Sequence, residues 1–141
     1  MRRVHDRLRD ALRVTREAVV SGDRGEPAVD DLLLFCRGFC TALTQHHAGE
    51  DRVLFPAIAA AHPQLRETLR KLEQDHSMVA YLLTGLEAVV DRDGSPAELD
   101  QHLERIAAIM ESHFRYEERQ LLGVLETLDL SANPGEVFGS L

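Results

Sequence analysis

The sequence predicts an all-α fold, an up-down-up-down antiparallel four-helix bundle. Apolar residues recur at intervals of three and four positions along most of the chain, which is the period of a helix with one buried face. No segment alternates between apolar and polar residues over the length of a strand, and turn signals divide the chain at three places. The 141 residues suffice for one domain, and short loops make consecutive helices antiparallel.

The three breaks set the limits of the predicted helices. SGDRGEP (21–27) separates the first two helices, and AHPQ (61–64) separates the second from the third. In the third break, Ser95 can cap the last helix, Pro96 fits its first position and Glu98 completes a capping box. We therefore expect helices over residues 2–20, 28–60, 64–91 and 96–128.

This division gives one bundle domain over residues 1–128 and a C-terminal tail over 129–141 that should be loosely held. Pro56 lies inside the second predicted helix. It should kink that helix, because it removes one backbone hydrogen bond and crowds the preceding turn.

Charge and composition exclude several classes of partner. With 24 acidic and 16 basic residues, the net charge of −8 disfavours binding to nucleic acid or to an anionic membrane. No apolar run is long enough to span a bilayer, and the N-terminus is too charged for a signal peptide. Two cysteines cannot form the framework of a small secreted fold, so we expect a soluble cytoplasmic protein.

The apolar stripes of all four predicted helices lead into polar residues. On the second helix, the face that carries Phe39 and Leu43 continues to His46 and Glu50. Burying such groups without a partner costs several kcal/mol, so they need a compensating partner, and a metal ion is one. The corresponding faces of the other helices continue to His5, to His76, and to His113 and Glu117.

Two of these segments repeat the pattern H-x-x-x-E-[DE]-x-x-L-[FL], at residues 46–55 and 113–122. A spacing of four places imidazole and carboxylate one turn apart on one helical face, where both can reach one ion or an adjacent pair. His5 and His76 precede the two patterns by similar distances, so each helical hairpin contributes one further histidine. The pattern predicts a pseudo-twofold site.

The axial positions of the four histidines agree with such a site. In each pair of consecutive helices, the two histidines lie at distances from the shared loop that match within one turn, about 5.4 Å. We therefore interpret His5, His46, Glu50, His76, His113 and Glu117 as a shared metal site in the bundle core. The alternative is a satisfied polar network in a metal-free bundle.

Other residues of chemical interest receive a structural interpretation. His47 and Asp51 lie about 100° around the helix from His46 and Glu50, so we expect them on the flank or in contact with the ligands. The alternative is a shifted register, in which this pair faces the site. Phe35 and Phe39 should form a dry wall above the site, Cys36 and Cys40 should be small buried hydrophobes, and Tyr116 should pack or donate a hydrogen bond. His102 lies too far from His113 along the helix to serve the same ions, and His62 should be a loop or cap residue.

These segments resemble the hemerythrin family, and specifically its bacterial HHE cation-binding branch. The resemblance covers the four predicted helices and rests on His5-Asp6, HHAGEDRVLFP (46–56), QDH (74–76) and HFRYEERQLL (113–122). It implies a non-haem di-iron centre, in which His5 and His46 hold one iron and His76 and His113 the other. Glu50 and Glu117 would bridge the two irons together with an oxo or hydroxo group. The ligand types also suit zinc or manganese.

One departure from the oxygen carriers of that family bears on function. Oxygen-carrying hemerythrins have a further histidine one turn from the ligand on the third helix, where this chain has Leu72 and Ala80. The resemblance then implies two histidines and an open position on each iron, which favours redox turnover over reversible storage. A ligand as close to a helix end as His5 is held loosely unless the helix begins upstream.

The resulting hypothesis is a di-iron protein that binds or reacts with O2, NO or peroxide, in redox turnover or sensing rather than bulk O2 transport. The chain has no flavin, haem or nucleotide motif, so a redox protein partner would supply electrons. One alternative is an iron- or oxygen-sensing bundle without catalysis, whose stability responds to metal occupancy. Another alternative is a metal-free helical interaction module.

Overall fold

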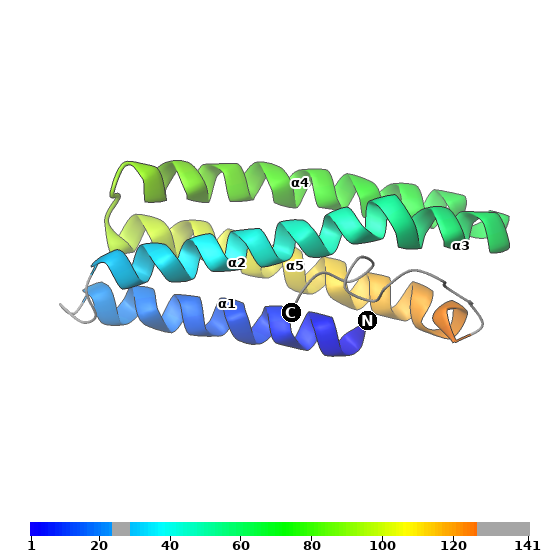
Figure 1. Cartoon of the computed structure of the whole chain (residues 1–141), viewed down its shortest axis with the longest axis horizontal. Coiled ribbons are helices and arrows are strands. Elements are labelled where there is room, and N and C mark those ends of the chain that lie inside the picture. The colour runs from blue at the N-terminus through cyan, green and yellow to red at the C-terminus, as the bar shows by residue number, and fades with distance from the viewer. Residues whose placement is uncertain (24–28, 127–141) are drawn as a thin grey trace.

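The computed structural model describes residues 1–23 and 29–126, with side chains described outside residues 21–35. These residues form a bundle of long helices that run side by side (Figure 1). The predicted all-α four-helix architecture is confirmed. The helices and short helical segments are α1 (Arg2–Asp23), α2 (Val29–Gly49), η1 (Glu50–Leu54), α3 (Phe55–Ala61), η2 (Pro63–Leu65), α4 (Arg66–Asp91) and α5 (Pro96–Leu125).

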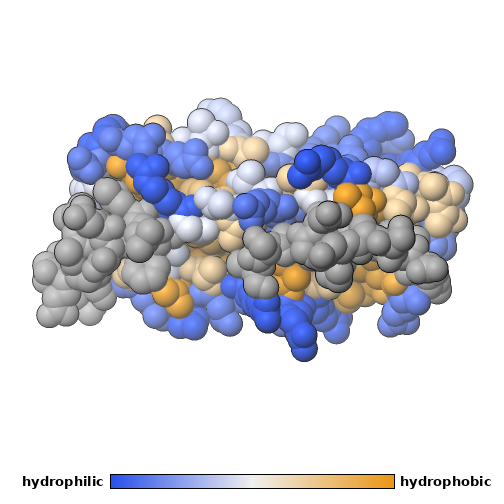
Figure 2. All heavy atoms as spheres, viewed as in Figure 1, coloured by the Kyte–Doolittle hydropathy of each residue, from blue (hydrophilic) through white to orange (hydrophobic). Residues whose placement is uncertain are grey.

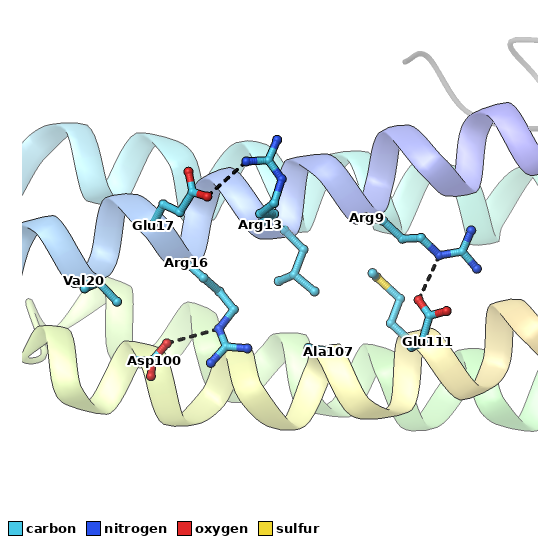
Figure 3. A pocket seen from close by; sticks show the side chains of 10 residues that line it. Arg9, Arg13, Arg16, Glu17, Val20, Asp100, Ala107 and Glu111 are labelled. Carbon is cyan, nitrogen blue, oxygen red and sulfur yellow. Dashed lines mark hydrogen bonds and ion pairs between the residues drawn. The ribbon is translucent and has the colours of Figure 1, made fainter.

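Each long helix packs against two others. The contacts join α1 to α2, α2 to α4, α4 to α5, and α5 back to α1, so the four helices enclose one core. Arg9 pairs with Glu111, and Arg16 with Asp100, across the groove between α1 and α5 (Figure 3). None of the described helices is long and apolar enough to cross a membrane.

The surface agrees with this arrangement. Hydrophilic residues dominate the upper and lower edges of the face in Figure 2, and apolar residues are visible between them. Among the described side chains, the large apolar residues that stay exposed are Val14, Val20, Met78 and Tyr81.

The second predicted helix, 28–60, is divided near Pro56. The structure replaces the expected simple kink with a π-helical turn, η1, between α2 and α3, and Pro56 lies in the first turn of α3. Because proline has no N–H to donate to the carbonyl of Arg52, the regular hydrogen-bond ladder cannot pass through this position. Single π-helical turns of this kind occur often at functional sites.

The last break follows the predicted pattern. Ser95 Oγ accepts a hydrogen bond from Glu98 N–H at 3.2 Å, and Pro96 begins α5. The Glu98 carboxylate pairs with Arg92 directly after α4 and also interacts with the backbone of Ser95, and both contacts lower its pKa. The tail 129–141 and the predicted end of the last helix at 128 lie outside the described residues.

Candidate metal centre

A layer of buried polar residues divides the described core into two apolar clusters. The larger cluster includes Leu8, Leu43, Val79 and Met110, one from each long helix. Along each helix the polar layer follows at the next inward positions. The smaller cluster lies beyond the layer and comprises Leu54, Phe55, Ile58, Leu69, Leu72 and Leu121.

All six residues that the sequence singled out lie in this layer. Each is at most 4% exposed. Together with His47 they form two groups. Within each group, the donor atoms all lie within 4.8 Å of one another. One group is His5, His46, Glu50 and Glu117, and the other is His47, Glu50, His76 and His113.

The two carboxylates lie between the two groups of histidines. The oxygens of Glu117 point to different sides, because Oε1 is 3.3 Å from His5 Nε2 and Oε2 is 3.1 Å from His113 Nε2. Glu50 Oε1 is 3.4 Å from His46 Nε2 and 3.2 Å from His76 Nε2. Each carboxylate can therefore reach ions held by both groups.

Local helix geometry explains these approaches. His113 and Glu117 are four residues apart on α5, so both side chains leave the same face one turn apart. His46 and Glu50 have the same spacing, and Glu50 is the first residue of the π-helical turn. Nε2 of His76 and Nε2 of His113 lie 3.1 Å apart, which shows that imidazoles from α4 and α5 converge on one point.

Outer carboxylates face the second ring nitrogen of three histidines. Such a pair fixes the ring orientation and raises the basicity of the nitrogen that faces a metal. Two of these carboxylates, Asp51 and Glu118, directly follow Glu50 and Glu117 in the repeated pattern. The Nδ1 distances are 2.8 Å for His76–Asp51, 3.2 Å for His113–Asp75 and 3.5 Å for His5–Glu118.

His5 is fixed in place although it lies near the start of α1. Its side chain is fully buried, and its backbone N–H donates to the carbonyl of Met1 at 3.0 Å. The ring stacks on Phe114, with centroids 3.9 Å apart and planes 4° from parallel. Arg9 holds the Glu118 carboxylate that faces His5, at 3.1 Å. We expected a histidine this close to a helix end to be held loosely, but contacts with Phe114 and Glu118 of α5 hold the His5 side chain in place.

Several buried polar atoms of the layer have no hydrogen-bond partner among the described residues. Both oxygens of Glu50, both oxygens of Glu117 and Nε2 of His47 are buried without a hydrogen-bond partner. Burial and the charge of Glu117 raise the pKa of Glu50 well above its ordinary value. Burial lowers the pKa of His76, but its contacts with the carboxylates of Asp51, Glu117 and Glu50 outweigh this and raise the pKa to about 11.

A bound cation would resolve this imbalance. It would offset the two buried carboxylates and give the unpaired oxygen and nitrogen atoms a partner. Imidazole nitrogens with carboxylate oxygens form a donor set that suits first-row transition metals, iron among them. The chemistry of the layer thus fits a pair of metal ions better than an apolar or hydrogen-bonded core.

His47 lies inside the centre, although we expected it on the flank or beside the ligands. It is 6% exposed, and burial lowers its pKa well below the ordinary value, so the ring is neutral. Consecutive residues of a helix are rotated by about 100° around its axis, so His47 faces α4, whereas His46 faces the other histidine group. Because α4 packs against α2, the ring of His47 lies against His76. The adjacent histidines at 46 and 47 were the signal in the sequence.

The other expectations concern residues outside the two groups. Asp51 contacts a histidine of the centre, as expected, and Cys36, Phe39 and Cys40 belong to the apolar core. Tyr116 lies beneath the cation of Lys71, and the half-buried His62 lies between α3 and η2 as the cap residue of both. The side chain of Phe35 lies outside the described residues.

Two surface cavities reach the histidines. One, of about 230 Å³, lies between α2 and α4 and is lined by His47 and His76 together with small residues such as Ala80. The other, of about 710 Å³, lies between α4 and α5 and reaches His113 and Asp75. Small molecules can approach the centre from either side of α4.

Comparison with known proteins identifies the family. The family model of the hemerythrin HHE cation-binding domain matches residues 1–125, which include every residue of both donor groups. The comparisons with curated proteins and with solved structures found no match. The matched span, the helical bundle and the buried His/Glu layer agree with the resemblance seen in the sequence. The chain belongs to the hemerythrin HHE cation-binding family.

Proposed function

We propose that this domain is a non-haem di-iron protein that binds or reacts with O2, NO or peroxide, in redox turnover or sensing rather than bulk O2 transport. The observation that carries the proposal is the pair of donor groups joined through Glu50 in a buried layer. Family membership supports cation binding, and the mixed nitrogen and oxygen donors favour iron.

The side chains have distinct tasks in this proposal. His5 and His46 would hold one iron, His76 and His113 the other, and Glu50 and Glu117 would span the pair. When bound, two ferrous ions would supply electrons to a small oxidant, and an external reductant would be needed to replace those electrons. Asp51, Asp75 and Glu118 keep the histidine Nδ1 atoms engaged, so that each Nε2 faces inward.

The surroundings favour a small ligand. Apolar clusters lie on both sides of the polar layer and keep bulk water from it, which strengthens each local charge. The cavity of about 230 Å³ beside His47 and His76 is smaller than the pockets that hold organic ligands, which start at about 300 Å³. Diatomic molecules and peroxide fit such a space.

Metal-dependent stability favours a sensor as the second candidate. Because Glu50 and Glu117 are buried without hydrogen-bond partners, the metal-free bundle carries a cost that metal binding removes. A sensor would use this difference to alter a protein contact, whereas a redox enzyme would need electrons from a partner protein. Both candidates share the same centre and differ in turnover.

Turnover under a supply of reductant separates the two candidates. Protein loaded anaerobically with ferrous iron is mixed with O2, peroxide or NO, with ascorbate as electron source, and consumption of the oxidant beyond that of a protein-free blank is followed. Redox turnover is supported if each chain consumes many equivalents of the oxidant. This activity should be lost in Glu117→Gln and unchanged in Glu104→Gln. A single stoichiometric and reversible response supports the sensor. No response to O2, NO or peroxide contradicts the proposed function.

A further inference from the structure

The imidazoles of the centre divide unequally between its two groups. The group that contains His5 and His46 has two imidazoles, whereas His47 brings the other group to three. We propose that His47 is a third imidazole ligand at the position of His76 and His113, so that the two metal positions differ in affinity. The inference rests on the proposed function, which supplies the metal.

The contacts of His47 are those of a ligand that lacks its ion. Its ring stacks on His76, with centroids 3.9 Å apart and planes 13° from parallel, and meets His113 edge-on at 5.4 Å. Its Nε2 is buried and makes no hydrogen bond. A neutral imidazole nitrogen in that setting costs free energy, and coordination to an ion would satisfy it.

The space around His47 explains why the third imidazole comes from α2. His47, His76 and Ala80 line the same cavity between α2 and α4, and Ala80 lies one turn after His76. The methyl side chain of Ala80 leaves room on the α4 side, which the imidazole from α2 uses. A histidine at position 80 would enter this cavity from the opposite helix.

Unequal ligation changes how the two positions behave. If Glu50 and Glu117 both span the pair, the position with three imidazoles has one protein donor more than the other and should bind its ion more tightly. The position of His5 and His46 has fewer protein donors, so a small external ligand should compete for a place there. This division replaces the expectation, based on four histidines, that both irons have an open position.

The test is an anaerobic titration with ferrous iron in competition with a chromogenic chelator. In the unaltered protein we expect one tight and one weaker step. In His47→Leu the tight step should weaken by more than about tenfold, since even partners outside the ligand set cost that much. Because leucine fills the site without a donor, circular dichroism should show unchanged helix content. His47→Ala serves as a second variant if leucine does not fit.

Two further variants make the test specific. His62→Ala removes a half-buried histidine outside both donor groups and should leave both steps unchanged. His47→Leu/Ala80→His returns an imidazole to the cavity from α4 and should restore the tight step. Unchanged binding by His47→Leu, or equal weakening of both steps, would overturn the inference. If the unaltered protein binds no iron, the proposed function itself fails, which is a different result.

Discussion

Nδ1 of His76 lies 2.8 Å from Oδ1 of Asp51, so a carboxylate on the π-helical turn fixes an imidazole on α4. Asp51 is the residue directly after Glu50, and therefore one short segment both faces the centre and orients a histidine from a neighbouring helix. Glu118 repeats the arrangement toward His5 at 3.5 Å. The twofold repetition in the sequence thus includes the outer partners of the histidines.

Asp51→Asn should weaken metal binding by about 10- to 100-fold, because His76 loses the negative partner that raises its basicity. The amide keeps the size of the side chain, so the fold should persist. Asp91→Asn is the matched control, because Asp91 pairs with Arg37 on the exposed surface. Chelator competition measures both variants, and equal affinities for the two would show that the Asp51 contact does not matter.

Phe114→Leu should destabilise the protein by about 1–3 kcal/mol and also lower metal occupancy, because the ring that stacks on His5 is lost. Phe39→Leu makes the same change in the same apolar cluster. Thermal unfolding and metal analysis of both variants separate packing from positioning. If the two lose metal equally, Phe114 acts only as core packing.

Glu50→Gln should stabilise the metal-free protein by about 1–3 kcal/mol, because it removes a buried carboxyl group that has no hydrogen-bond partner and whose ionisation burial and Glu117 oppose. The same change should abolish the rise in melting temperature that ferrous iron gives the unaltered protein. Glu104→Gln, on the exposed face of α5, should change neither quantity. Metal-free Glu50→Gln that is less stable than the unaltered protein would contradict the imbalance described for the centre.

Cys36 and Cys40 should react slowly with iodoacetamide. Burial raises the pKa of Cys36 from 9.0 to about 11, and burial followed by the charge of Glu87 raises that of Cys40 to about 12. At pH 8 this lowers the thiolate fraction of Cys36 about 100-fold relative to the unfolded chain. The protonated thiols thus support the fold fully below pH 9, and this contribution is lost as pH rises through 11. Equal alkylation rates in buffer and in guanidinium would contradict this account.

The fold could be predicted closely from the sequence because its signals are local. Helical periodicity and the breaks near Pro63 and Ser95 place the helices. For example, α1 ends at Asp23, a few residues after the predicted end at residue 20. The π-helical turn could not be predicted in the same way. Pro56 shows that the ladder must break, but the form of the break depends on how Glu50 and Leu54 pack in the finished core.

The candidate centre shows the same division. Helical spacing and matched axial levels were enough to bring His5, His46, His76 and His113 together with both carboxylates. Periodicity left the exact place of His47 open, because its contact with His76 depends on which helix lies beside α2. Contacts between helices far apart in sequence, such as His5 with Phe114, are likewise visible only in the structure.

The central claim is that the buried layer holds a pair of iron ions. The most direct measurement is the metal content per chain of anaerobically purified protein, read with its visible spectrum before and after air is admitted. We predict close to two irons per chain, one for each donor group, with charge-transfer bands of a ferric pair after oxidation. Two zinc ions per chain, or no metal even after reconstitution with ferrous iron, would contradict the account.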